Sequence, residues 1–149
     1  MTKFWRNWLV VWCWSVAGLG LLLAGAGFAA TEGPTIVLMA LLHDGGAVEL
    51  DGVSRFAVGL MGALTMALGL LVGIGAAAAE ELGSAGATIW RRLVMVLAAW
   101  YVVDSAISCA NGFTFNAVSN SLIMIAFLMP VLASGVMGSA SARAAHQPG

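Results

Sequence analysis

The sequence predicts an all-α membrane protein built as a four-helix transmembrane bundle. Of its 149 residues, 61% are hydrophobic and only 9% are charged, whereas a soluble domain carries about 25% charged residues. Four continuous apolar stretches each have the roughly 20 residues that a helix needs to cross a bilayer. The basic residues are also unevenly divided between the loops that these stretches would leave. We therefore expect lipid, not water, to surround most of the chain.

Each predicted span is an unbroken apolar run. A helix satisfies its own backbone hydrogen bonds inside hydrocarbon, whereas a β-barrel would show short strands of alternating polarity. The spans are expected at about residues 8–30, 56–79, 89–109 and 117–137. They make up one transmembrane domain over residues 1–138, followed by a tail, residues 139–149, that we expect to be disordered in the cytoplasm.

The first span also has features of a secretory signal peptide, because Lys3 and Arg6 precede it and Gly27-Phe28-Ala29 resembles a cleavage site. Its apolar run is longer than the roughly 7–15 residues of such peptides. Its tryptophans suit an interfacial anchor. The pattern favours a retained span, with cleavage as the alternative.

A shorter apolar run follows the first span. Residues 34–42 are too few to cross a bilayer. Pro34 is typical of a helix start, and Asp44-Gly45-Gly46 breaks the run. We expect a short interfacial helix that lies on, or dips into, the outer face of the membrane between spans one and two. An ordered loop is the alternative.

The basic residues predict the orientation. With four spans, one side of the membrane receives all of them except Arg55. Short loops rich in Lys and Arg stay in the cytoplasm. Both termini are therefore expected there. The residues on that side are Lys3, Arg6, Arg91, Arg92 and Arg143.

Small residues recur at helical spacing along the second span. They include Gly59, Gly62, Gly69 and Gly73. Helices in lipid associate through close contact at such residues, because lipid offers no hydrophobic drive for association. The pattern favours tight packing inside this one bundle, with homodimerisation as the alternative.

Asp104 lies inside the third span, where an ionisable group is costly and is expected to have a partner or a function. Chain direction brings polar residues of three spans to a similar depth: Arg55, Asp104, Ser105, Ser108, Asn116 and Asn120. One interpretation, which we favour on sequence alone, is a buried Arg55–Asp104 ion pair completed by the amides and hydroxyls. The other is an outward-facing pocket for a proton, an ion or a small polar ligand.

No residue is predicted to be catalytic, to bind a cofactor or to bind a metal. The net charge of −1 and the absence of a basic stretch argue against nucleic acid as a partner. Cys13 and Cys109 lack a C-x-x-C spacing, and no histidine lies in a span to bind haem. Walker loops, nucleophile elbows and zinc signatures do not occur.

Several stretches resemble small bacterial four-helix inner-membrane proteins of the DoxX-like sort. They are Asp51-Gly52 with Arg55-Phe56, the run from Gly59 to Gly69, and Trp100-Tyr101-Val102-Val103-Asp104-Ser105 with Asn116 and Pro130. The resemblance implies a multi-pass protein of the bacterial inner membrane. It implies no catalytic residue, because such proteins mostly lack an assigned activity.

The leading functional prediction is a non-enzymatic accessory or assembly subunit of a larger inner-membrane complex. Its expected partners are the lipid bilayer and either other membrane subunits or a second copy of itself. One alternative is a small transporter or channel subunit with a polar site around Asp104. Another is a quinone- or lipid-interacting redox helper.

Overall fold

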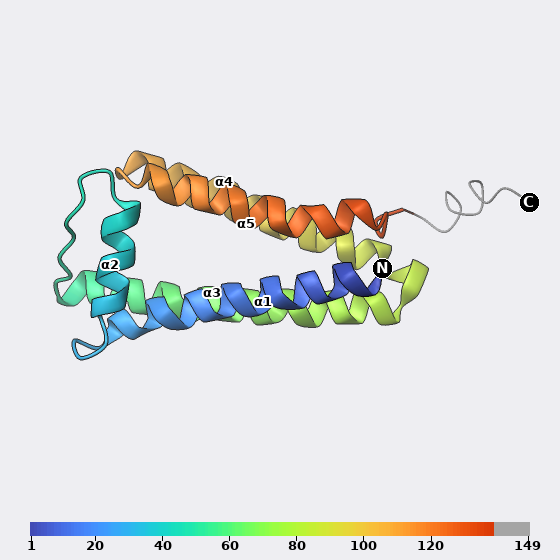
Figure 1. The fold of residues 1–149 in the computed structure, drawn as a ribbon, viewed down its shortest axis with the longest axis horizontal. Helices are drawn as coiled ribbons and strands as arrows, with labels where there is room; N and C mark the ends of the chain where they lie inside the picture. The colour runs from blue at the N-terminus through green and yellow to red at the C-terminus, as the bar shows by residue number, and fades with distance from the viewer. Residues whose placement is uncertain (139–149) are drawn as a thin grey trace, which may run out of the picture.

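The computed structural model describes residues 1–138, and the secondary structure in this range is helical (Figure 1). Four helices are long and apolar enough to cross a membrane, which confirms the all-α class and the number of candidate spans. They are α1 (Lys3–Ala24), α3 (Gly52–Glu81), α4 (Ala87–Ala110) and α5 (Thr114–Ala133). The predicted disordered tail, with Arg143, lies outside the described residues.

Three shorter helical segments join them. The expected short helix is present as α2 (Gly33–Leu42), with Pro34 in its first turn. The 3-10 turn η1 (Gly25–Gly27) ends α1 before the predicted boundary at residue 30, and η2 (Gly83–Gly86) links α3 to α4.

α3 begins earlier than the predicted span because of a capping box. The Ser54 amide donates to Asp51 Oδ1 (2.7 Å), and the Asp51 amide donates to Ser54 Oγ (3.1 Å). Such a box satisfies backbone donors that a helix start leaves unpaired. The bonds from Ser54, chiefly from its side chain, hold the pKa of the Asp51 carboxyl below its ordinary value. One result is that Arg55 lies within the first turns of α3.

The long helices form two antiparallel pairs, α1 with α3 and α4 with α5 (Figure 1). The pairs come closest at the end that holds the start of α1, η2 and the end of α5, which we call the terminal end. They diverge toward the opposite end, where α2 crosses between them. We call this the α2 end.

Glycines set the close approach of α1 and α3. A Cβ atom at Gly62 would overlap the backbone of Ala24, and one at Gly20 would overlap that of Met66. The other glycines predicted to pack lie on the same side of α3: Gly59 meets Gly27, Gly69 meets Ala17 and Gly73 meets Cys13. These faces are therefore occupied within the chain.

Two tryptophans of α1 link it to α5. Trp12 Nε1 donates to the carbonyl of Ile123 (2.9 Å), and Trp8 Nε1 donates to that of Ala126 (2.8 Å). The Ala126 carbonyl needs a partner because Pro130, four residues later, has no N–H to donate to it. An unpaired carbonyl is costly where no water can reach it. Trp8 thus replaces the backbone hydrogen bond that Pro130 removes from α5.

Replacing Trp8 with phenylalanine is expected to destabilise the fold by about 1–2 kcal/mol, since the Ala126 carbonyl loses its donor. In a Pro130→Ala background the new alanine N–H takes that carbonyl, so the same Trp8 change should cost less. A double-mutant cycle of unfolding in detergent measures this coupling. An equal cost of Trp8→Phe in both backgrounds would contradict the assignment.

Candidate polar site between α4 and α5

Asp104 lies on the side of α4 that faces α5. The spacing of Leu97, Tyr101, Asp104 and Ser108 places them along one stripe of a helix. The two ends of this stripe are buried, since Leu97 is 1% and Ser108 is 6% exposed. Asp104 itself is partly buried.

Neutral groups donate to the Asp104 carboxylate. Its Oδ1 accepts from Ser108 Oγ and from Asn116 Nδ2, both at 3.2 Å. Asn116 Nδ2 also donates to Ser108 Oγ (2.8 Å). The structure therefore brings together three of the residues singled out in the sequence, from two neighbouring helices. Within residues 1–138, no hydrogen bond or ion pair involves Asp104 Oδ2.

Two more polar side chains on the same helix segments each have an atom that could form a hydrogen bond and does not. Ser105 Oγ and Asn120 Nδ2 are buried and have no hydrogen-bond partner among the described residues. Asn120 is only 4% exposed and lies one turn beyond Asn116. Buried polar atoms are rarely left unpaired. Asp104 Oδ2 and Ser105 Oγ are thus available to accept from a ligand or to bind a cation, whereas Asn120 Nδ2 can only donate.

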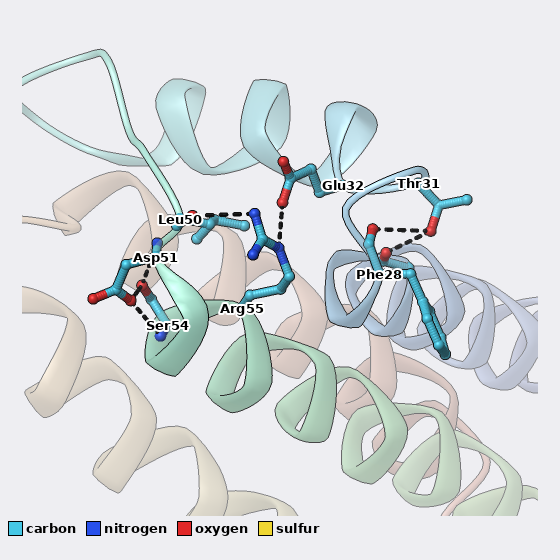
Figure 2. Close-up of polar contacts among 8 residues, drawn as sticks. Phe28, Thr31, Glu32, Leu50, Asp51, Ser54 and Arg55 are labelled. Atoms are coloured by element: carbon cyan, nitrogen blue, oxygen red, sulfur yellow. Dashed lines mark hydrogen bonds and ion pairs between the residues drawn. The ribbon is translucent and has the colours of Figure 1, made fainter.

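Arg55 has a different partner from the one expected. Its Nε donates to Glu32 Oε2 (2.7 Å), and its Nη2 donates to the Leu50 carbonyl (3.3 Å), as Figure 2 shows. Glu32 directly precedes α2, which begins beside the start of α3, whereas Asp104 belongs to the other helix pair. Arg55 therefore does not supply the counter-ion that the sequence suggested for Asp104.

The far end of α2 is attached to the turn between α4 and α5. Asp44 Oδ1 accepts from the Thr114 amide (3.2 Å) and from Thr114 Oγ1 (2.5 Å), so Asp44 caps the start of α5. The His43 ring packs against Phe113 with centroids 4.7 Å apart. Sequence reasoning missed these contacts, because a cap supplied from 70 residues away leaves no local pattern.

The near end of α2 is attached to α1. Thr35, which is fully buried, donates from Oγ1 to the Leu22 carbonyl (2.8 Å). Together with the Asp44 contacts, this bond makes α2 a tether between the two helix pairs at the α2 end. Asp104 lies six residues before the end of α4, about 9 Å from that end at the rise of a helix.

Searches for similar proteins gave no match among family models, curated proteins or solved structures. In residues 1–138, His, Cys, Asp and Glu form no group of three or more that could hold a metal ion. The site is therefore interpreted from its own residues.

Proposed function

We propose that this chain is a small transporter or channel subunit that binds a proton or another small cation at Asp104. One observation carries the proposal. Asp104 is a carboxylate on an apolar helix of membrane-spanning length, and its partners in the described part of the chain are neutral. A charge in apolar surroundings needs a compensating charge. Arg55 is paired with Glu32 and does not compensate Asp104. A bound cation would supply the compensating positive charge.

The chemistry of the cluster suits a hard cation. Carboxylate, hydroxyl and amide oxygens are the ligands that protons and alkali or alkaline-earth ions prefer, whereas transition metals favour nitrogen and sulfur. Asp104, Ser105 and Ser108 offer such oxygens on one segment of α4, and Asn116 holds two of them in place through its Nδ2. The short distance from Asp104 to the α2 end supports entry of the cation from that end.

The proposal includes an orientation and a location. Lys3, Arg6, Arg91 and Arg92 belong to the terminal end, and Arg55 belongs to the α2 end. By the positive-inside rule this asymmetry supports a cytoplasmic terminal end. Asp104 would then be reached from the outer, non-cytoplasmic side of the membrane. The membrane proposed is the bacterial inner membrane, as the resemblance to small four-helix proteins implies.

A second candidate function is the accessory or assembly subunit. It is favoured by α4, because only 11% of the most apolar window of its span is buried, against 39% for α1. The uncovered surface of α4 suits a helix of another membrane protein as well as it suits lipid. Purification in mild detergent distinguishes the two functions. A stoichiometric protein partner supports the subunit, and transport by the purified chain alone supports the cation site.

Replacing Asp104 with asparagine is expected to abolish cation flux and leave the fold intact, since the amide keeps the shape and one oxygen acceptor. The purified protein is reconstituted into liposomes that contain a pH-sensitive or a sodium-sensitive dye, and ion gradients are imposed. Wild-type protein should dissipate one of these gradients, and Asp104→Asn should fall to the rate of protein-free liposomes.

The matched control is Asp44→Asn, which changes an acid outside the cluster and keeps an oxygen for Thr114. It should retain wild-type flux. The proposal fails if Asp104→Asn conducts like the wild type, or if the wild type dissipates neither gradient. Unchanged elution and melting of the Asp104 variant establish that it is folded.

A further inference from the structure

Two adjoining cavities lie at the terminal end, far from Asp104. One is a groove of about 410 Å³ between α1 and α3, and the other is a smaller pocket of about 160 Å³ beside η2. Arg6, Glu80 and Trp90 line both. An apolar groove that continues into a charged pocket is complementary in shape and polarity to an amphiphilic ligand.

The groove is open beside Gly73, where α3 has no side chain. At Gly69 the backbone of Cys13 and Ala17 takes that space, 2.8 Å from where a Cβ atom would lie. Gly69 and Gly73 both line the groove, and a Cβ atom at Gly73 would be only in ordinary contact with Cys13. The groove extends from Glu80 to Gly69, which is about 16 Å along α3 at the rise of a helix. Apolar side chains line this length: Leu9, Val10, Trp14, Leu70 and Ile74. A hydrocarbon chain fits it.

The charged end offers one group of each sign. Arg6 Nε donates to Glu80 Oε2 (3.0 Å), and the Arg6 side chain is 60% exposed. The two terminal nitrogens of Arg6 have no partner within residues 1–138. Glu80 Oε1 is buried and also has no hydrogen-bond partner among these residues. The site thus has donors for an anion and, beside them, a buried acceptor for a cation.

We infer that this site binds a phospholipid with a primary-amine headgroup, of the phosphatidylethanolamine class. The phosphate accepts from the terminal nitrogens of Arg6, the ammonium donates to Glu80 Oε1, and one acyl chain lies in the groove over Gly69 and Gly73. A primary ammonium has three N–H donors. The quaternary ammonium of phosphatidylcholine has none, so the site selects against it.

The depth of the site agrees with this ligand. Arg6, Glu80 and the buried Trp90 lie at the terminal end of three spanning helices, where lipid headgroups would be found. The groove runs from there toward the middle of α1 and α3, as an acyl chain runs in a bilayer. The inference does not depend on cation binding at Asp104.

The test measures binding of three lipids with the same acyl chains to the purified full-length protein by native mass spectrometry. The lipids carry ethanolamine, choline or glycerol headgroups. Wild-type protein should bind the ethanolamine lipid roughly tenfold more tightly than the choline lipid, the usual effect of one charge-assisted hydrogen bond. The glycerol lipid, which has no amine, should also bind more weakly than the ethanolamine lipid.

Two variants test the two halves of the site. Glu80→Gln should remove the preference for ethanolamine over choline, whereas Glu81→Gln, a neighbouring exposed acid that lines neither cavity, should keep it. Gly73→Leu fills the groove and should weaken the binding of all three lipids. Gly18→Leu, at an open position, should leave their binding unchanged. Equal binding of the ethanolamine and choline lipids to the wild type would overturn the inference, and so would a preference that survives Glu80→Gln.

Discussion

Gly62→Ala is expected to lower the free energy of unfolding by about 3 kcal/mol or more, the upper range for overpacking a well-packed core. The added Cβ would overlap the backbone of Leu23 and Ala24 in α1. Backbone atoms cannot rotate away as a flexible side chain can. α1 and α3 would have to separate by more than about 1 Å, which forfeits much of the dispersion energy along their contact. In lipid that contact is the main force that joins two helices.

The control is Gly18→Ala in the middle of α1, where nothing lies within 4 Å of the added atom. Alanine is the better helix former by about 1 kcal/mol, so this change should leave stability the same or raise it. Unfolding in mixed micelles, followed by tryptophan fluorescence, gives both values. We expect Gly62→Ala to lower the free energy of unfolding and Gly18→Ala to leave it unchanged or raise it. If Gly62→Ala proved as benign as Gly18→Ala, the glycine contact would not determine the packing of α1 on α3.

The sequence was sufficient for features that depend on local pattern. Hydropathy located the four helices, because a spanning helix must be apolar over its whole length. The glycines of α3 were visible from their spacing. The grouping of Asp104, Ser108 and Asn116 also followed from chain direction, since a short turn between antiparallel α4 and α5 leaves little freedom of register.

The partner of Arg55 could not be predicted in the same way. It depends on where α2 lies, and α2 is positioned by contacts with distant segments: Thr35 with Leu22, and Asp44 with Thr114. Once α2 crosses between the helix pairs, Glu32 lies beside Arg55 (Figure 2). The sequence alone favoured a structural role for Asp104 because it offered Arg55 as a counter-ion. Without that counter-ion, a bound ligand better accounts for a carboxylate at this position.

The donor to the Ala126 carbonyl, which Pro130 leaves unpaired, could not be predicted from the sequence either. The position of Pro130 in a predicted helix identifies Ala126 as a carbonyl without its helical donor. The sequence does not show which side chain donates instead. Trp8 lies 118 residues away, and its predicted role as an interfacial anchor gave no sign of this bond.

Asp104→Leu is expected to stabilise the fold by about 1–2 kcal/mol while abolishing cation flux, because an uncompensated carboxylate in an apolar segment is costly to the folded state. Leucine has the same branched outline as aspartate, so the packing between α4 and α5 changes little. Of the two donors that lose Oδ1, Asn116 Nδ2 still donates to Ser108 Oγ at 2.8 Å. The Ser108 hydroxyl can rotate to donate to a backbone carbonyl one turn earlier in α4.

The sign of this change separates the two roles of Asp104. If the carboxylate is a structural acceptor that locks α4 to α5, its removal should destabilise the protein by about 1–3 kcal/mol, the cost of breaking buried polar contacts. If it is held for a cation, the fold gains when it is removed. Melting of Asp104→Leu and of the adjacent Val103→Leu, an exposed control, compares both in one detergent. A higher melting temperature together with lost flux is the combination expected of a ligand site, since loss of a structural acceptor should lower stability.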